Sequence, residues 1–303
     1  MNREAIDAVL SAITGVASKP GNERVTAIVN RIVKDLFHTI EDFDVQPAEF
    51  WHALDYLAQA GRSNELGLIA AGLGFEHFLD LRMDEAEAKA GIEGGTPRTI
   101  EGPLYIAGAP ESVGQARLDD GKEDGEILFM QGTVFDVEGK PLPNALVEVW
   151  HANRLGNYSF FDSTQSDFNL RRSIRTDADG RYQFRTIMPV GYSVPPGGAT
   201  DKLLQQLGRH GTRPAHIHFF VTADGHRKLT TQINIDGDPF LWDDFAFATR
   251  EGLVPKITRV DDAKSMDRHG VEAPFASIDF DFTLHLENEK APTSDIVRSH
   301  AGA

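Results

Sequence analysis

The residues best suited to chemistry in this sequence are the two histidines of His216-Ile217-His218. On a β-strand, residues two apart point to the same face, so both imidazoles could reach one metal ion. Imidazole is the commonest metal ligand in proteins, but two partly exposed strand histidines would give the same pattern. Taken alone, the pair supports a metal site and an incidental pair about equally.

The donors that could complete a metal site are limited by composition. The sequence contains no cysteine, which excludes thiolate ligands and disulfides. Residues 219–223, which follow the pair, contain no carboxylate. A third histidine, His226, lies beyond a turn signal and is expected to face elsewhere, which weighs against a zinc hydratase site. Aspartate, glutamate and tyrosine from other segments remain as candidate donors.

The chain falls into a helical part and a strand-rich part. Apolar residues recur at helical spacing through much of the first ninety residues, and Pro47 suits the first turn of a helix. Glycines and Pro97 mark a connector at 91–98. We therefore predict a helical N-terminal domain over 1–98. Its helical patterns cover 6–16, 28–36, 50–57 and 66–81.

Short strands and frequent turns characterise the remainder. Turn signals at 177–180 and 223–226 separate β-rich segments, and apolar residues alternate with polar ones from Ile278 to Leu286. This pattern predicts an antiparallel β-sandwich over 99–303, so the expected fold class is mainly β with a helical N-terminal region. The polar tail from Glu287 to Ala303 is expected to be loosely held.

Charge and hydropathy exclude some classes of partner. The 303 residues include 30 basic and 46 acidic side chains, which gives a formal charge of −16. Such a charge opposes binding to nucleic acid and to anionic membranes. The N-terminus lacks a basic stretch followed by an apolar run, and no apolar run is long enough for a membrane span. We therefore expect a cytoplasmic protein.

Three segments, in this order, resemble the metal-ligand regions of the intradiol ring-cleavage dioxygenases. They run from Val147 to Ser159, from Thr176 to Tyr192 and from Gly208 to His218. The helical region and the segment Thr99–Tyr105 extend the resemblance over nearly the whole chain. The chain length and the helical region favour the catechol 1,2-dioxygenase subfamily over the shorter chlorocatechol and protocatechuate enzymes.

The resemblance implies one non-heme Fe(III) per subunit, bound by Tyr158, Tyr192, His216 and His218. Phenolate is a hard, anionic ligand, so two phenolates favour Fe(III) over Fe(II). Without the resemblance, the two tyrosines would be interpreted as packing residues. The implied reaction is cleavage of catechol by O2 to cis,cis-muconate, a step of aromatic catabolism in the β-ketoadipate pathway.

The resemblance also assigns roles around the metal. Tyr192 is the ligand expected to leave the iron and take up a proton, Arg213 stabilises negative charge on the ring, and Gln232 lies near the iron. Ordinary roles in a salt bridge and a cross-strand hydrogen bond would suit Arg213 and Gln232 as well. The implied substrate-binding residues, each of which could equally be core, are Leu68, Ala71, Ile100, Pro103, Leu104, Arg213, Phe245 and Ala246.

The family resemblance also suggests partners, and two other kinds of function remain as alternatives. Members of this family dimerise through the helical region and can hold a phospholipid there, so a homodimer is expected. Hydroxyquinol or chlorocatechol could replace catechol as substrate with the same iron site. A different class of protein, a transthyretin-like binding module with an incidental histidine pair, would bind no metal. Ferric tyrosinate should colour the protein, whereas the binding module and a zinc enzyme would be colourless.

Overall fold

The computed structural model describes residues 1–14, 19 and 21–287. The predicted loosely held tail lies outside the described residues, apart from Glu287. The chain divides into two compact units, Met1–Ser63 and Asn64–Ala303. Within the described residues, no helix combines the length and the apolar character that crossing a membrane would require.

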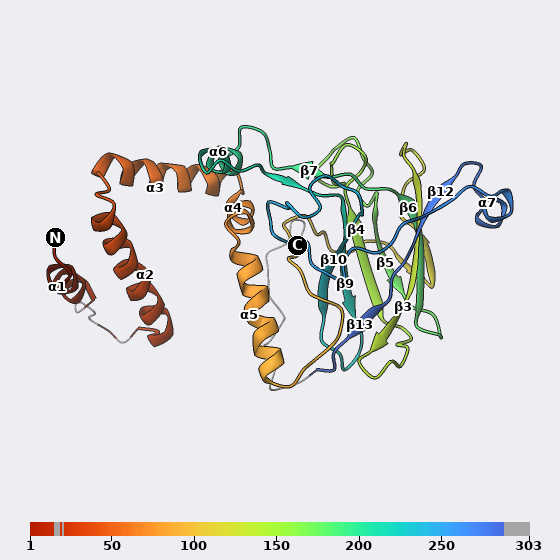
Figure 1. Ribbon diagram of the computed structural model, residues 1–303, viewed down its shortest axis with the longest axis horizontal. Coiled ribbons are helices and arrows are strands. Elements are labelled where there is room, and N and C mark those ends of the chain that lie inside the picture. The colour runs from red at the N-terminus through yellow and green to blue at the C-terminus, as the bar shows by residue number, and fades with distance from the viewer. Residues whose placement is uncertain (15–18, 20, 288–303) are drawn as a thin grey trace. The chain divides into compact units, whose positions relative to one another are not determined.

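The first unit consists of helices, drawn in red to orange in Figure 1. The α2 helix begins after Asn22, whose side chain accepts the backbone N–H of Val25, and α3 begins with a capping box between Gln46 and Glu49. The helical prediction is therefore confirmed for 28–36 and 50–57. The helices are α1 (Arg3–Thr14), α2 (Glu23–Asp42) and α3 (Pro47–Arg62).

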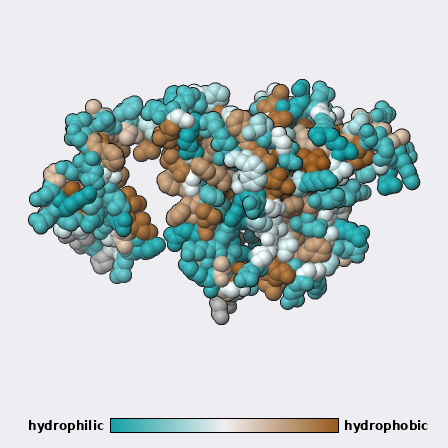
Figure 2. Space-filling view, in the orientation of Figure 1, coloured by the Kyte–Doolittle hydropathy of each residue, from teal (hydrophilic) through white to brown (hydrophobic). Residues whose placement is uncertain are grey.

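Many large apolar side chains of the first unit are exposed, and Figure 2 shows several of them at its surface. In α2, none of the described residues is buried. An amphipathic helix whose apolar side faces solvent is typical of a surface that packs against another chain or segment. The exposed apolar side chains of α2 and α3 include Val25, Ile28, Val29, Ile32, Leu36, Trp51 and Leu57.

The second unit opens with two helices, α4 (Leu66–Gly72) and α5 (Phe75–Lys89). The predicted helical stretch 66–81 is thus interrupted. The interruption falls at Gly74, whose φ of 78° lies in the left-handed region that glycine tolerates best. Both helices group with the strands in the compact unit from Asn64 onward. The predicted domain boundary between residues 98 and 99 stays a prediction.

The strands of the second unit form two large sheets and one small one. The five-stranded sheet has the order β1 (Glu111–Val113), β5 (Arg171–Arg175), β4 (Leu146–His151), β9 (His216–Thr222), β10 (Leu229–Asn234). The six-stranded sheet has the order β11 (Thr258–Val260), β12 (Phe275–Asp279), β3 (Ile127–Asp136), β6 (Arg181–Ile187), β2 (Gln115–Arg117), and β13 (Phe282–Leu284) also pairs with β3. The remaining elements are β7 (Tyr192–Ser193), β8 (Thr212–Arg213), α6 (Ala199–Gln206) and α7 (Ala263–His269).

The large sheets are mixed, so the prediction of an antiparallel architecture was wrong in part. β1 pairs with β5, β2 with β6, and both β12 and β13 with β3, all in parallel. Neighbours joined along β3–β6, β5–β4–β9–β10 and β11–β12 are antiparallel. A tight hairpin cannot join parallel strands, so turn signals in the sequence do not reveal these pairings. The four strands β1, β2, β12 and β13 lie before β3 or after β10 in the chain, far from their partners.

The two large sheets share one hydrophobic core. Strand periodicity places alternate residues of β4 and β9 on the face that contributes to this core. Figure 1 shows β4, β9 and β10 beside β3 and β6 in the same part of the molecule. The buried core cluster includes Leu128, Met130, Val147, Val149, Phe184, Ile217, Phe219, Val221, Ile233 and Ile278.

Candidate metal centre

His216 and His218 lie on the face of β9 opposite the shared core. Their neighbours Ile217 and Phe219 belong to that core, so strand alternation turns both histidines outward. They are nevertheless only 1% and 2% exposed, because loops cover this face of the sheet. Their Nε2 atoms are 3.0 Å apart. The expected same-face geometry of the two imidazoles is present.

Both imidazoles are held as neutral donors. The Nδ1–H of His216 donates to the Pro214 carbonyl at 2.6 Å, so Nε2 of this ring carries the lone pair, toward which Nη1 of Arg213 points at 3.1 Å. Burial, with the Arg213 charge second, lowers the pKa of His216 to about 3. Burial and the neighbouring His216 lower the pKa of His218 well below its usual range. Two neutral nitrogens therefore face each other at neutral pH.

Tyr158 and Tyr192 bring two phenol oxygens to the same place. Their hydroxyls are 3.4 Å apart, and the Tyr192 ring centroid is 5.5 Å from that of His216. Tyr158 follows β4 in a loop and is buried, whereas Tyr192 begins β7 and is half-buried. Burial, followed by Tyr192, raises the pKa of the Tyr158 phenol well above 10. A phenolate at Tyr158 therefore needs a positive charge nearby.

Two glycines allow these loops to approach so closely. A Cβ on Gly156 would lie 2.7 Å from Cβ of Tyr192, and φ of Gly156 is +79°. A Cβ on Gly191 would lie 2.6 Å from the Arg213 carbonyl oxygen. Any side chain at either position would push the Tyr158 loop or β8 away from Tyr192. The sequence places both glycines beside the tyrosines, in Gly156-Asn157-Tyr158 and Gly191-Tyr192.

Trp150 is a residue of the site that the sequence predictions did not assign. In the sheet register it pairs with His218, and its ring stacks on that imidazole with centroids 5.0 Å apart and an interplanar angle of 6°. The rings of Phe220 and Tyr105 also contact the indole, each in an edge-to-face arrangement. This aromatic packing fixes the plane of the His218 ring.

Arg171 is a second unassigned residue, buried to 2% exposure. Its guanidinium donates to the Leu104 carbonyl at 2.8 Å, to Ser159 Oγ at 2.9 Å and to the Ser159 carbonyl at 3.1 Å. It lies 5.8 Å from the Tyr158 ring centroid. Burial lowers the pKa of Arg171 to about 10, so it stays charged at neutral pH. It holds the Tyr158 loop against the segment that contains Leu104.

Arg213 and Gln232 form one buried network beside the histidines. Arg213 Nη1 is 3.1 Å from His216 Nε2, and Nη2 donates to Gln232 Oε1 at 2.7 Å. Gln232 pairs with His218 in the sheet register and donates to Asn234 Oδ1 at 3.1 Å. Burial opposes the charge of Arg213, but Asp244 and the tyrosines outweigh it and raise the pKa of the guanidinium.

The predicted pocket residues divide into three groups. Leu104 packs against the cluster that contains Trp150, Tyr158 and Tyr192. Pro103 is exposed and is in none of the clusters that the described residues form. Apart from Arg213, which lies beside the histidines, the others share an apolar group that we term the pocket cluster, Leu68, Ala71, Ile100, Val194, Leu204, Phe245, Ala246 and Ala248.

Polar contacts hold the pocket cluster together. Arg209 donates to the Gly72 carbonyl at 2.7 Å and to the Phe245 carbonyl at 3.2 Å, which joins α4 to the opposite wall. The buried Glu65 carboxylate accepts the backbone N–H groups of Ala199 and Thr200 at the start of α6. Neither Arg209 nor Glu65 was assigned from sequence, because each acts through backbone atoms far away in the chain.

The donor set fits a hard metal ion. Within residues 1–14, 19 and 21–287, no group of three or more His, Cys, Asp or Glu side chains could hold a metal. The phenol oxygens of Tyr158 and Tyr192 are oxygen donors that the fold brings beside the histidine pair. The Nδ1 atom of His218 is buried without a hydrogen-bond partner, so no hydrogen bond at Nδ1 fixes this ring in another orientation. The ligand assignments stay predictions.

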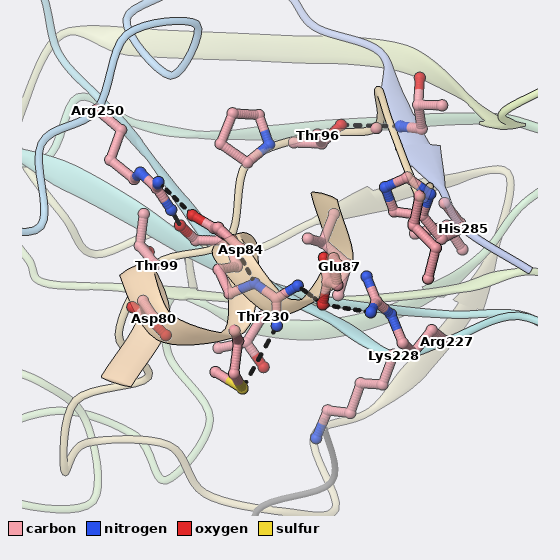
Figure 3. Close-up of a pocket in the computed structure, with 18 of the residues that line it drawn as sticks. Asp80, Asp84, Glu87, Thr96, Thr99, Arg227, Lys228, Thr230, Arg250 and His285 are labelled. Atoms are coloured by element: carbon pink, nitrogen blue, oxygen red, sulfur yellow. Dashed lines mark hydrogen bonds and ion pairs between the residues drawn. The ribbon is translucent and has the colours of Figure 1, made fainter. Parts of the chain in front are cut away.

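A separate cavity of about 300 Å³ lies against α5 (Figure 3). It is lined by an alternating set of charges that we term the ion-pair cluster, Asp84, Glu87, Arg98, Arg227 and Arg250. Asp84 accepts from Arg98 at 2.9 Å and from Arg250, and Glu87 accepts from Arg98 and Arg227. Figure 3 shows these contacts as dashed lines. Ile100 lines both this cavity and the pocket cluster.

Comparison with known proteins shows the family to which the chain belongs. The family model described as "Catechol dioxygenase N terminus" matches residues 22–91, and the model described as "Dioxygenase" matches 100–286. The chain is 72% identical to catechol 1,2-dioxygenase 2 of Acinetobacter lwoffii over 88% of this chain and 96% of that protein. It is 56% identical to catechol 1,2-dioxygenase of Acinetobacter guillouiae over 98% of both.

A solved structure gives the same result for the fold. Wild-type Acinetobacter radioresistens catechol 1,2-dioxygenase is 58% identical and superimposes with a TM-score of 0.96. The match covers 100% of this chain and 99% of that one. The helices before residue 91 and the two sheets after it are thus both represented in the relatives. The chain belongs to the catechol 1,2-dioxygenase family of intradiol ring-cleaving enzymes.

Proposed function

We propose that this enzyme binds Fe(III) through Tyr158, Tyr192, His216 and His218 and cleaves catechol with O2 to cis,cis-muconate. The observation that carries the proposal is the convergence of like groups, with two neutral Nε2 atoms 3.0 Å apart beside two phenol oxygens 3.4 Å apart. The two phenols are joined to each other by one hydrogen bond, and so are the two imidazoles. A shared cation would satisfy all four.

When bound, ferric iron supplies an electrophilic centre that orients the two catechol oxygens and draws electron density from them. His216 and His218 serve as donors that do not compete for protons, because both stay neutral. Tyr158 is the phenol that stays in place, since Arg171 lies near its ring and holds its loop. Tyr192 is half-buried and has greater freedom, which supports its role as the group that takes up a proton from catechol.

Arg213 is suited to stabilise negative charge on the bound substrate. Its guanidinium is buried, stays charged and has Nη1 directed toward His216. In a site that excludes water, a fixed positive charge stabilises a developing anion more strongly than it would in solvent. Gln232 contributes by fixing Nη2 of the same guanidinium.

The pocket cluster favours a catechol without a further polar substituent. Its members are Leu, Ala, Ile, Val and Phe side chains, which offer no hydrogen-bond partner. A third hydroxyl, as in hydroxyquinol, would lose its hydrogen bonds to water there without replacement. Catechol is therefore the preferred substrate over hydroxyquinol, and its cleavage belongs to aromatic catabolism through the β-ketoadipate pathway.

We further propose that the two large sheets form a β-sandwich and that residues 1–98 act as a dimerisation domain. The shared core supports the first statement, and the exposed apolar side chains of the α2 and α3 helices support the second. The same apolar surface could hold a phospholipid at the dimer interface. The acidic, cysteine-free composition supports a cytoplasmic location.

Adding catechol to the iron-loaded protein without oxygen, and then admitting O2, tests the proposed function. We expect an absorption change on anaerobic addition and stoichiometric cis,cis-muconate after oxygen is admitted. Hydroxyquinol should give a lower kcat/KM than catechol. A ring-opened aldehyde, which reports cleavage beside the two hydroxyls instead of between them, would contradict the proposal, as would the absence of any product.

A further inference from the structure

Arg213 has an anchor that the sequence did not reveal, the carboxylate of Asp244. Asp244 lies between β10 and β11 and is 6% exposed. Its Oδ1 accepts the Nε–H of Arg213 at 3.3 Å, and its Oδ2 accepts an N–H of Nη2 at 3.1 Å. A two-point contact of this kind fixes the plane of a guanidinium as well as its distance.

This contact decides which nitrogen of Arg213 faces the metal centre. Nη2 also donates to Gln232 Oε1 at 2.7 Å, so Nε and Nη2 are both occupied on the far edge. Nη1 is the nitrogen that faces His216, at 3.1 Å from Nε2. Rotation of the guanidinium about its long axis would break the Asp244 contact and carry Nη1 away from the metal centre.

The same carboxylate folds the backbone that follows it. Oδ1 accepts the N–H of Ala246 at 3.0 Å, and Oδ2 accepts the N–H of Ala248 at 3.3 Å. The N–H of Phe245 donates to the carbonyl of Thr212, the residue before Arg213. Phe245, Ala246 and Ala248 all belong to the pocket cluster. Asp244 therefore joins the charged group of the site to its apolar wall.

The neighbouring residue Asp243 provides a natural contrast. Its side chain is 78% exposed and pairs with Nε2 of His210 at 3.1 Å, near the surface. It makes none of the contacts with Arg213 that Asp244 makes. The two aspartates have the same chemistry and adjacent positions, so a substitution at Asp243 controls for the general effect of removing one carboxylate.

We propose that Asp244 is a positioning residue for catechol: it directs Nη1 of Arg213 toward the metal centre and holds Phe245 and Ala246 in the pocket wall. The inference rests on the proposed function and adds the residue through which charge recognition and ring recognition are linked. A buried ion pair with satisfied hydrogen bonds is suited to such a role, because neither partner can move independently.

The substitution Asp244→Asn tests the proposal in the iron-loaded full chain. Asparagine keeps the size and one acceptor oxygen but loses the charge and the second acceptor. We expect kcat/KM for catechol to fall on the order of a hundredfold, with iron content and the tyrosinate absorption band unchanged. The matched control Asp243→Asn should stay within about twofold of wild type.

An Arg213→Met background separates positioning from general damage. There, Asp244→Asn should lower kcat/KM by less than about threefold, because the guanidinium it directs is already gone. The ratio of kcat/KM for catechol to that for 4-methylcatechol should still change, because the pocket wall is still released. If the double variant instead lost kcat/KM by the product of the two single-variant losses, the proposal would be overturned.

Other outcomes are also decisive. Wild-type turnover by a folded Asp244→Asn protein would overturn the positioning role. If this variant does not fold, Asp244→Glu keeps the charge but displaces it by one methylene, and it should still lose turnover; wild-type activity would overturn the proposal. Failure of both variants to fold would make Asp244 purely structural. A wild-type protein that does not cleave catechol would instead contradict the proposed function.

Discussion

The unit from Asn64 onward contains two groups of buried polar side chains that are built on opposite principles. In the ion-pair cluster beside α5, positive and negative groups alternate, and every carboxylate accepts from two guanidinium groups. At the candidate metal centre, like faces like, with nitrogen beside nitrogen and phenol oxygen beside phenol oxygen. In the first arrangement, the opposite charges neutralise each other and no further ion is needed. The second brings together four neutral side chains that could all bind one cation.

This difference separates structure from function without reference to any relative. Alternating charges offset their own desolvation and join α5 to the connector, to the β9–β10 turn and to the Arg250 segment. Converging neutral donors offset little, and they persist because the surrounding sheet and loops fix them. Burial of polar groups is therefore not the mark of a functional site. The mark is the convergence of neutral nitrogen and oxygen donors that one cation could bind together.

The largest effect of a substitution is expected at the histidines of the candidate metal centre. His218→Ala removes one of the four proposed donors, so we expect loss of bound iron and a fall in catechol turnover on the order of a thousandfold or more. Iron content per chain, measured by elemental analysis, checks this outcome. His226→Ala is the matched control, because His226 contacts its own turn through the Asp224 carbonyl. Full iron content in His218→Ala would refute the assignment.

At the ion-pair cluster the expected loss concerns folding. Glu87→Gln leaves Arg98 and Arg227 without their shared carboxylate, so the free energy of unfolding should fall by about 2–4 kcal/mol. Urea titration of wild type and variant measures this difference. Iron content and the absorption band should be unchanged in the folded variant. Loss of the band at full folding would mean that the two regions are not independent.

Asp80 lines the same cavity, but the guanidinium hydrogen bonds found there go to Asp84 and Glu87. Burial raises its pKa from 3.8 to about 6, although Arg98 and Arg250 lower it and Asp84 and Glu76 raise it. A carboxyl whose pKa is raised on folding loses stability as pH rises through that value. Asp80→Asn should therefore stabilise the protein at pH 7.5 by about 1–3 kcal/mol.

The pH dependence identifies the cause of that gain. The stability difference between Asp80→Asn and wild type should be small below about pH 3.8, grow between about pH 4 and 6, and level off above about pH 6, because these limits are the unfolded and folded pKa values of Asp80. At pH 7.5, Asp84→Asn should instead destabilise the protein, because it removes the carboxylate that is paired with Arg98 and Arg250. A difference for Asp80→Asn that does not vary with pH would show that packing, and not ionisation, is responsible.

The sequence predicted what depends on short-range periodicity. The same-face placement of His216 and His218 follows from a period of two, and the helices at 28–36 and 50–57 follow from a period of 3.6. The break between α4 and α5 was missed, since a glycine within a helical pattern does not reveal its φ. The parallel pairings of β1, β2, β12 and β13 were missed because they join segments far apart in the chain.

The candidate site depends even more on distant contacts. Tyr158 and Tyr192 are separated by 33 intervening residues in the sequence, and no spacing rule brings their hydroxyls together. Only the family resemblance pointed to them. Asp243 and Asp244 are adjacent and chemically identical, yet one is exposed and the other is buried against Arg213. Which of the two is buried depends on the fold of the segment after β10, so sequence alone could not separate them.

The most direct test of the account is the absorption spectrum of the iron-loaded protein and of three Tyr→Phe variants. Tyr158→Phe and Tyr192→Phe should each weaken or shift the tyrosinate-to-iron charge-transfer band. Tyr182→Phe should leave it unchanged, because Tyr182 is as buried as Tyr158 but donates to the Phe280 carbonyl, between β12 and β13. A wild-type spectrum in both of the first two variants would contradict the proposed metal centre.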